Sequence, residues 1–369
     1  ILSFHKRECD ESPTLLLHPQ RSLLLKPNHN LSAISISQNT YTKMPEYLVT
    51  GGAGFIASYI IKSLLELGHT VRTTVRNPPY VSKGDEEKVG FLCEFQGAKQ
   101  RLKILQADLT VEGSFDEAVN GVDGVFHTAS PVLVPQDHNV RETLVDPTIK
   151  GTTNVMSFCA KSKATLKRIV LTSSCSSIRY RFDATEASPL NESHWSDPEY
   201  CKRFNLWYGY AKTLGEKEAW RIAEEKGLDL VVVNPSFVVG PLLGPKPTST
   251  LLMILAIVKG LAGEYPNFTV GFVHIDDVVA SHVLAMEEPK ASGRIICSSS
   301  VAHWSEIIEL MRNKYPSYPF ENKCSNKEGD NSPHSMDTRK IQELGFGSFK
   351  SLPEMFDDCI ISFQKKGLL

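Results

Sequence analysis

A tyrosine and a lysine one helical turn apart are the first residues of this sequence that could do chemistry. Tyr208 and Lys212 lie in the stretch WYGYAK, and side chains at positions i and i+4 share one face of a helix. A cation beside a phenol favours the phenolate, which lowers the pKa of the tyrosine from about 10. We therefore expect Lys212 to make Tyr208 a usable proton donor near neutral pH. A Tyr-x-x-x-Lys pair also arises by chance, so this interpretation depends on its partners.

A serine at the end of an expected strand supplies the third candidate group. The stretch RIVLTSS places Ser173 and Ser174 after an apolar run, and ligands of open α/β sheets bind at the carboxyl ends of the strands. A serine hydroxyl and a phenol that converge on one carbonyl oxygen, with a lysine beside the phenol, form a proton-donating site for hydride transfer. We predict Ser174, Tyr208 and Lys212 as the catalytic residues.

The elements that must position these residues follow from the hydrophobic pattern. From Glu46 onward, short β-branched runs such as YLVT, TVRTTV and LDLVVV alternate with amphipathic helical segments, a pattern typical of a parallel sheet covered on both faces. The sequence predicts a doubly wound α/β (Rossmann) fold. The alternation weakens after Pro241. We expect a dinucleotide-binding domain over 44–240 and a smaller substrate-binding lobe, mainly 241–369, with some segments that return to the first domain.

Glycines at the end of the first strand indicate a dinucleotide site. The stretch VTGGAGFIAS holds Gly51, Gly54 and Ala57 at the spacing G-x-x-G-x-x-A. These glycines permit a tight turn and let a pyrophosphate approach the N–H groups of a helix start. The alternative is a plain strand-to-helix turn, but the position within a β-α-β unit favours a cofactor. We predict Gly51, Gly54, Phe55 and Ile56 as cofactor-binding.

The end of the second strand indicates which dinucleotide binds. TVRTTVRNP lacks the carboxylate that holds the ribose 2′-hydroxyl of NAD. Arg72 and Arg76 flank the strand end, and arginines suit a 2′-phosphate, so we predict NADPH; the alternative is a solvated basic strand end. Asp108 and Leu109 are expected at the adenine. The other predicted cofactor-binding residues come from loops after the strands and from the catalytic pair: Lys88, Thr128, Ala129, Ser130, Pro235, Val238, Tyr208 and Lys212.

Three acid or histidine positions favour structural roles over metal binding. FVHIDDVV could present His274 and Asp276 to a metal, but no third ligand is spaced nearby, so we predict helix capping by an aspartate instead. His127, on an apolar strand, is expected to be a core histidine with its hydrogen bonds satisfied. We predict no metal site.

Composition excludes several function classes. The formal net charge of the 369 residues is -2, with basic and acidic residues interspersed, which argues against nucleic-acid or anionic-membrane binding. The longest apolar run, LLMILAIV, is far shorter than the roughly 20 residues that cross a bilayer. Eight dispersed cysteines suit free thiols in a reducing compartment, so we expect a cytoplasmic protein, with nuclear presence left open. Residues 1–43 lack sustained periodicity and are expected to be a leader or upstream extension.

Taken in order, the motifs resemble those of the extended short-chain dehydrogenase/reductases, in the plant branch that contains dihydroflavonol reductases and cinnamoyl-CoA reductases. The resemblance covers 44–369 and rests on VTGGAGFIAS, TVRNP, ADL, HTASPV, LTSSCSS, WYGYAK, NPSFVVGP and FVHIDDV. It implies that Ser174, Tyr208 and Lys212 are the catalytic triad and that NADPH donates the hydride. The stretch PYVSKG after Pro78 is longer than the usual loop of this family.

Departures from the family pattern bear on the substrate. Cinnamoyl-CoA reductases carry NWYCYGK, whereas this chain has Leu206 in place of that asparagine. Their CoA-binding histidine, lysine and arginine correspond here to Met253, Ala256 and Asp276, so a CoA thioester is not expected. Dihydroflavonol reductases place an asparagine five residues after the catalytic serine, where this chain has Arg179. We predict Arg179 and Met253 as substrate-binding residues.

The stretch SSCSSIRYRFDATEASPLNESHWSDPEYC is similar to that of the tetraketide α-pyrone reductases. The resemblance implies reduction of a ketone on the side chain of a hydrophobic polyketide pyrone, a step toward the pollen-wall polymer sporopollenin, and association with other enzymes of that pathway. The apolar LLMILAIV helix would suit an alkyl tail, although a buried structural helix has the same pattern. A phenylpropanoid or dihydroflavonol reductase is the alternative, and a non-catalytic NADP-binding sensor is the third. The complete triad argues against the sensor.

Overall fold

The structure is a computed structural model, and the residues it describes are 44–78, 88–131, 139–247, 249–326 and 332–369. The expected leader, 1–43, and the stretch PYVSKG lie outside these described residues. Pro45–Leu369 form one compact unit, which contains two sheets. The predicted boundary near residue 240 stays a prediction.

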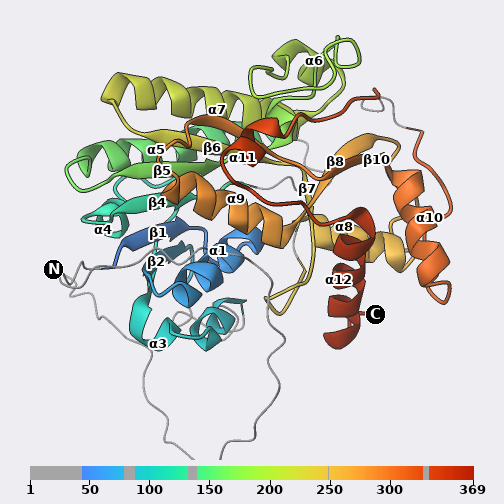
Figure 1. The fold of residues 1–369 in the computed structure, drawn as a ribbon, viewed down its shortest axis with the longest axis horizontal. Coiled ribbons are helices and arrows are strands. Elements are labelled where there is room, and N and C mark those ends of the chain that lie inside the picture. Colours follow the sequence, from blue (N-terminus) through green and yellow to red (C-terminus); the bar gives the residue numbers. More distant parts are fainter. Residues whose placement is uncertain (1–43, 79–87, 132–138, 248, 327–331) are drawn as a thin grey trace, which may run out of the picture. The chain divides into compact units, whose positions relative to one another are not determined.

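Seven parallel strands form the larger sheet (Figure 1). They are β1 Glu46–Thr50, β2 Thr70–Val75, β3 Leu102–Gln106, β4 Gly124–His127, β5 Arg168–Thr172, β6 Leu230–Pro235 and β9 Gly293–Cys297. Their order across the sheet is β3-β2-β1-β4-β5-β6-β9. The order reverses between β1 and β4, and ligands of open α/β sheets bind in the crevice at such a point. This topology confirms the predicted doubly wound α/β fold.

Helices cover both faces of this sheet (Figure 1). The main ones are α1 Phe55–Glu66 with α9 Ile275–Glu287, and α5 Asp146–Lys161 with α7 Trp207–Lys226. Each pair packs together on its own side. Leu48 belongs to the core beneath α5 and α7, whereas Val49 belongs to the core beneath α1 and α9, because successive strand residues point to opposite faces. Burial on both faces explains why the strands read as continuous apolar runs.

Short helices complete the loops of this part of the chain. They are η1 Gly90–Glu94, α3 Ala98–Arg101, α4 Asp116–Val119, η2 Arg141–Val145, η3 Cys175–Ser177 and α6 Pro198–Arg203. Helix α7 starts at Trp207 and ends at Lys226, and the φ of 60° at Gly227, which follows it, is the left-handed conformation of a glycine C-cap. It therefore carries Tyr208 and Lys212 on its first two turns.

The smaller sheet and the remaining helices come mostly from the C-terminal third of the chain. Their bounds are β7 Phe237–Val239, α8 Ser249–Val258, β8 Thr269–His274, β10 Ser300–His303, α10 Trp304–Lys314, α11 Arg339–Glu343 and α12 Leu352–Lys365. The strand order is β10-β8-β7. Phe272 at the centre of this sheet has ring centroids of Trp304 and Phe356 at 5.4 and 5.5 Å. In the described part of the chain, no helix is both long and apolar enough to span a bilayer.

Candidate active site

The structure brings the three predicted catalytic residues together. Tyr208 and Lys212 lie on successive turns of α7, with the Lys212 ammonium 5.8 Å from the centroid of the Tyr208 ring. Ser174 follows β5, and its hydroxyl is hydrogen-bonded to the Tyr208 phenol. The site therefore contains two hydrogen-bonded hydroxyl groups, those of Ser174 and Tyr208, with the Lys212 ammonium beside them.

Local backbone structure orients the Ser174 hydroxyl. Ser174 is the N-cap of η3, and its Oγ accepts a hydrogen bond of 3.1 Å from the backbone N–H of Ser176. Because the backbone occupies an acceptor position, the hydroxyl proton can be donated to the phenol or to a carbonyl oxygen of a substrate. This serine is buried, which strengthens such a bond.

The pKa of Tyr208 differs from the expectation. Burial raises it above its usual value of 10, and the hydrogen bond from Ser174 only partly opposes that effect. The sequence shows that Lys212 is nearby, but it does not show how strongly tertiary packing removes the phenol from water. The pKa of Lys212 is lowered to about 8, also by burial, and the carboxylate of Glu216 opposes this shift. The expectation that Lys212 gives Tyr208 a net lowered pKa is therefore wrong for this structure.

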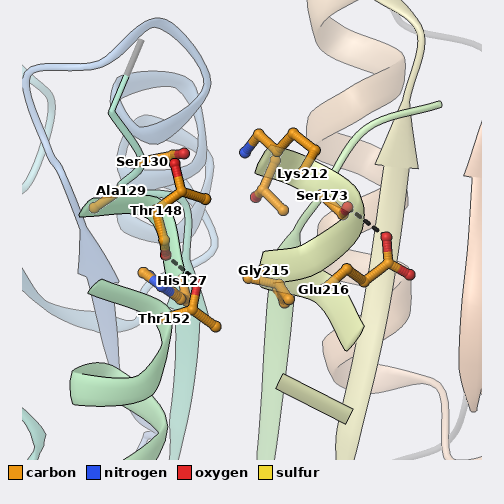
Figure 2. A pocket seen from close by; sticks show the side chains of 11 residues that line it. His127, Ala129, Ser130, Thr148, Thr152, Ser173, Lys212, Gly215 and Glu216 are labelled. Carbon is orange, nitrogen blue, oxygen red and sulfur yellow. Dashed lines mark hydrogen bonds between the residues drawn. The ribbon is translucent and has the colours of Figure 1, made fainter. Parts of the chain in front are cut away.

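A small polar cavity lies beside Lys212, where β4 and β5 meet α5 and α7 (Figure 2). Its volume is about 20 Å³, enough for about one water molecule. His127 lines it and forms a 2.9 Å hydrogen bond between Nδ1 and the Thr50 hydroxyl. Burial, and secondarily the charge of Lys212, lowers the pKa of His127 to about 3. This confirms His127 as a hydrogen-bonded core histidine.

The glycine turn after β1 is shaped for close approach of a ligand. Gly51 has φ of 75°, and a side chain there would place its Cβ 3.0 Å from the Cα and Cβ of Ala129. Gly54 is the N-cap of α1, and no side chain caps this helix or adds an acidic charge to its first turn. Phe55 and Ile56 form the start of that first turn. The N–H groups at this helix start can therefore receive a phosphate.

The loop after β4 lies against the same turn. Thr128 donates its hydroxyl proton to the Thr50 carbonyl at 2.5 Å, and the Ala129 N–H donates to the Thr50 hydroxyl at 3.0 Å. Ser130 lines the cavity beside Lys212. The predicted residues Thr128, Ala129 and Ser130 thus lie at the switch point between β1 and β4.

The two arginines of the second strand have different positions. Arg76 follows β2 at the carboxyl edge, and its charge helps to lower the pKa of Asp108, although hydrogen bonds from Thr110 contribute more. Arg72 lies in the amino half of β2, where its Nε and Nη2 donate to the carboxylate of Glu46 at 2.7 and 3.0 Å. Because Glu46 begins β1, this ion pair lies away from the edge that carries the glycine turn. Arg72 is therefore removed from the predicted cofactor set.

The remaining predicted cofactor residues take part in local hydrogen bonds, core packing or strands, or are exposed. Asp108 Oδ1 accepts bonds from the N–H and hydroxyl of Thr110, and Leu109 packs against the core beneath α5. Pro235 ends β6 and Val238 lies in β7, both beyond the catalytic serine's strand. Lys88 is exposed. Their contacts with a cofactor stay predictions.

The predicted substrate residues divide into one buried and one partly exposed position. Arg179 is 4% exposed, and its guanidinium donates to the carbonyl of Thr269 and to the hydroxyl of Tyr180. These bonds give it a structural role between η3 and β8. Met253 on α8 is only partly buried. Leu252, on the same helix, is 55% exposed.

The cap of α9 is a histidine and not an aspartate as predicted. Nδ1 of His274 accepts a 3.0 Å hydrogen bond from the N–H of Asp276. The Asp276 carboxylate instead accepts a 2.8 Å bond from the Lys350 ammonium. The sequence could not show this partner, 74 positions away. Among the described residues no cluster of three metal-ligating side chains occurs.

Two buried charged residues near the triad were not predicted. Glu216 is 2% exposed and Arg294 is 6% exposed, and they form an ion pair with Nε and Oε1 2.6 Å apart. Glu216 lies four residues after Lys212, a spacing that could have drawn attention to it. Arg294 lies on β9, and no motif or spacing in the sequence indicates that it contacts Glu216.

A model of the NAD dependent epimerase/dehydratase family matches residues 47–297. The chain belongs to this family. It is 94% identical over 326 residues to tetraketide alpha-pyrone reductase 2 of Arabidopsis thaliana, a match that covers 88% of this chain and 100% of that relative. Its fold is similar to vestitone reductase from alfalfa (Medicago sativa L.), with 32% identity, a TM-score of 0.73, and coverage of 88% of this chain and 100% of that one.

A more distant solved structure shares the fold. Yeast methylglyoxal/isovaleraldehyde reductase Gre2, in complex with NADPH, matches with a TM-score of 0.73 at 22% identity, and covers 88% of this chain and 100% of that chain. At this identity the likeness shows the fold alone.

Proposed function

We propose that the protein is an NADPH-dependent reductase that converts a side-chain ketone of a hydrophobic tetraketide α-pyrone to the secondary alcohol, a step toward sporopollenin in a plant. The observation that carries this proposal is the 94% identity to a tetraketide alpha-pyrone reductase along that relative's whole length. The convergence of Ser174, Tyr208 and Lys212 supports the reaction type.

The residues at the carboxyl edge fit the cofactor. The turn at Gly51 has no room for a side chain, the N-terminus of α1 has no side-chain cap, and Arg76 offers a cation beside the end of β2. We assign the pyrophosphate to the turn and helix start, and the 2′-phosphate to Arg76. When bound, NADPH supplies the hydride that the carbonyl carbon accepts.

Tyr208 supplies the proton. The Ser174 hydroxyl donates a hydrogen bond to the carbonyl oxygen and holds it near the phenol, and the phenol then transfers its proton to the oxygen as negative charge develops there. The raised pKa of Tyr208 keeps the phenol protonated at neutral pH, which suits an acid in the reductive direction. The Lys212 ammonium stabilises the phenolate that remains, so the reduction needs Lys212 in its charged form.

Part of α8 offers an apolar surface for the substrate tail. Leu251, Ile254 and Ile257 are buried in the core of the smaller sheet, which fits the structural interpretation of this helix. Leu252 and Met253 remain outside that core or at its margin, so we assign the tail contact to them. Burial of each CH₂ of the tail would contribute about 0.8 kcal/mol.

Two aspects of the cellular setting stay proposals. We propose a cytoplasmic location on the basis of the dispersed cysteines, and association with other enzymes of the polyketide pathway on the basis of the family resemblance. Cell fractionation and affinity purification from the tissue that makes the pyrone would test them.

Steady-state kinetics with purified protein test the proposed substrate. Alkyl tetraketide α-pyrones with tails of increasing length should support NADPH oxidation, with kcat/KM rising with tail length. Cinnamoyl-CoA and feruloyl-CoA should support little, because Met253, Ala256 and Asp276 place no cation for CoA phosphates. Efficient turnover of a CoA ester without turnover of the pyrone would contradict the substrate and leave the reductase chemistry in place.

A further inference from the structure

A buried ion pair connects the catalytic helix to the loop that carries the catalytic serine. Oε2 of Glu216 accepts hydrogen bonds from the hydroxyls of Ser173 and Ser177 at 2.5 and 2.6 Å, and from the Asn234 amide at 2.9 Å. The first of these bonds is drawn in Figure 2. Its Oε1 accepts from Nε of Arg294 at 2.6 Å. All four bonds go to one carboxylate on α7.

The two serines stand on either side of the catalytic serine. Ser173 precedes Ser174 and Ser177 ends η3, so Glu216 holds the loop at both ends. Asn234 adds a bond of 3.3 Å to the Ser174 carbonyl. A displacement of this loop by about 1 Å would misplace the Ser174 hydroxyl, and such an error can lower a rate by about 10².

Arg294 holds the other side of the same loop. Its Nη2 donates to the Ser177 hydroxyl at 3.0 Å, and its Nη1 donates to the backbone carbonyls of Glu192 and His194. The guanidinium lies over the ring of Trp195, 3.8 Å from the centroid. Within the described part of the chain, the Arg294 side chain therefore donates to Glu216, to Ser177 and to the segment beside Trp195.

The same residue lies one helical turn after Lys212 on α7, and the charge of its carboxylate raises the pKa of Lys212 against the effect of burial. Glu216 and Lys212 both line the cavity of Figure 2, and among the described residues that line it Glu216 is the one carboxylate. The other groups that face this space are His127, which is neutral at working pH, and the hydroxyls of Thr148 and Thr152 from α5. Tyr208 lies on the same helix, α7, as Lys212 and Glu216. Charged groups of the elements packed against α7 are exposed: Arg141, Glu142, Asp146, Lys150, Lys161, Glu199, Lys202 and Arg203.

Net stability alone does not explain such a pair. Replacing a buried ion pair by apolar residues of similar volume is often neutral or stabilising, whereas removing one partner is strongly destabilising. The bonds of Glu216 and Arg294 are instead suited to fixing the position of the loop that carries Ser174. We propose that Glu216, together with Arg294, is a positioning residue of the reaction: it fixes the loop that presents Ser174 and sustains the positive charge of Lys212.

Variants of the pair separate positioning from a purely structural role. The proposal rests on the proposed reductase function, so the substrate is an alkyl tetraketide α-pyrone with saturating NADPH. We expect Glu216→Gln and Arg294→Met to lower kcat by about 10- to 100-fold with little change in KM. The alkaline limb of the kcat profile should move to lower pH by about 0.5 to 1 unit in Glu216→Gln, because the carboxylate that favours charged Lys212 is gone. Arg294→Lys should recover part of kcat.

Arg168 provides the matched control. It begins β5, pairs with Asp229 at 3.0 Å, and donates to the carbonyls of Ala285 and Glu288. Arg168→Met thus removes a comparable guanidinium from the same sheet and should lower the melting temperature without a shift of the pH profile. If Glu216→Gln and Arg294→Met fail to fold, Ser177→Ala tests the same proposal, because it removes only one hydroxyl that bonds to Glu216 and Arg294. This variant should lower kcat at least threefold.

The outcomes distinguish this proposal from the proposed function. A Glu216→Gln enzyme with the kcat and pH profile of the unaltered protein overturns the positioning role, as does an equal loss of kcat in Arg168→Met and Arg294→Met. If the unaltered protein does not reduce the pyrone, the proposed substrate is wrong, and fluorescence titration of NADPH binding against pH then tests the effect of Glu216 on Lys212. An unchanged titration midpoint in Glu216→Gln overturns the electrostatic part.

Discussion

The two arginines of the second strand give a paired test of cofactor selection. Both are candidate ligands for the 2′-phosphate by sequence, but Arg76 lies at the carboxyl edge and Arg72 is bonded to Glu46. We predict that Arg76→Ala weakens NADPH binding and leaves NADH binding nearly unchanged. Arg72→Ala should leave the affinity for both cofactors unchanged.

The magnitude follows from the bonds that each variant loses. A hydrogen bond to a charged group contributes about 1.5 to 3 kcal/mol, so loss of the Arg76 contact should raise the Kd for NADPH about 10- to 150-fold. Arg72→Ala breaks a pair whose side chains are 17% and 16% exposed, together with bonds to the carbonyls of Glu117 and Asn120. It should lower the free energy of unfolding by about 1 to 3 kcal/mol.

Fluorescence titration with NADPH and NADH, and urea unfolding of the same samples, measure both effects. The ratio of the Kd for NADPH to the Kd for NADH should change only in Arg76→Ala. The free energy of unfolding should fall mainly in Arg72→Ala. Equal weakening of NADPH and NADH in Arg76→Ala would refute the assignment of the 2′-phosphate. A loss of NADPH affinity in Arg72→Ala would refute its removal from the site.

Further predictions concern the acid, the pH dependence and the substrate surface. Tyr208→Phe should keep the melting temperature but lose about 10²- to 10⁴-fold in kcat, and a loss below tenfold would exclude Tyr208 as the proton donor. The kcat for ketone reduction should fall as the pH rises through about 8, where Lys212 loses its proton; a flat profile up to pH 10 would contradict the need for its charge. Burial lowers the pKa values of His127 and His282 to about 3 and about 4. The unfolded chain therefore binds more protons below pH 6.5, and the unfolding free energy should drop by up to about 1.4 kcal/mol per histidine for each pH unit down to those values; calorimetry from pH 7 to 4 measures this. Leu252→Asp should lower kcat/KM more for long-tailed than for short-tailed pyrones, and an equal effect on both would remove α8 from the tail site.

The alternating pattern and the motif order predicted the fold because both are local in sequence. Strands such as YLVT are apolar throughout because both faces of the sheet are covered, and a sequence shows this directly. The pair Tyr208 and Lys212 was equally visible, since four-residue spacing fixes a shared helical face. Ser174 was found from its position after a strand.

Properties set by tertiary contacts could not be predicted in this way. Arg72 was misassigned because only the pairing of β1 with β2 shows that its guanidinium meets Glu46. The predicted direction of the pKa shift of Tyr208 was wrong, because desolvation depends on what packs around the phenol. Arg294 reaches Glu216 across 78 positions of sequence, and no local pattern indicates such a contact.

Transfer of a labelled hydride tests the central claim most directly. The purified protein should be incubated with an alkyl tetraketide α-pyrone and NADPH that carries deuterium at the transferred position of the nicotinamide, and the product analysed by mass spectrometry and NMR. The account predicts one deuterium per product, on the new carbinol carbon of the side chain, and almost none with Tyr208→Phe. An unreacted pyrone, or an alcohol without deuterium at that carbon, would contradict it.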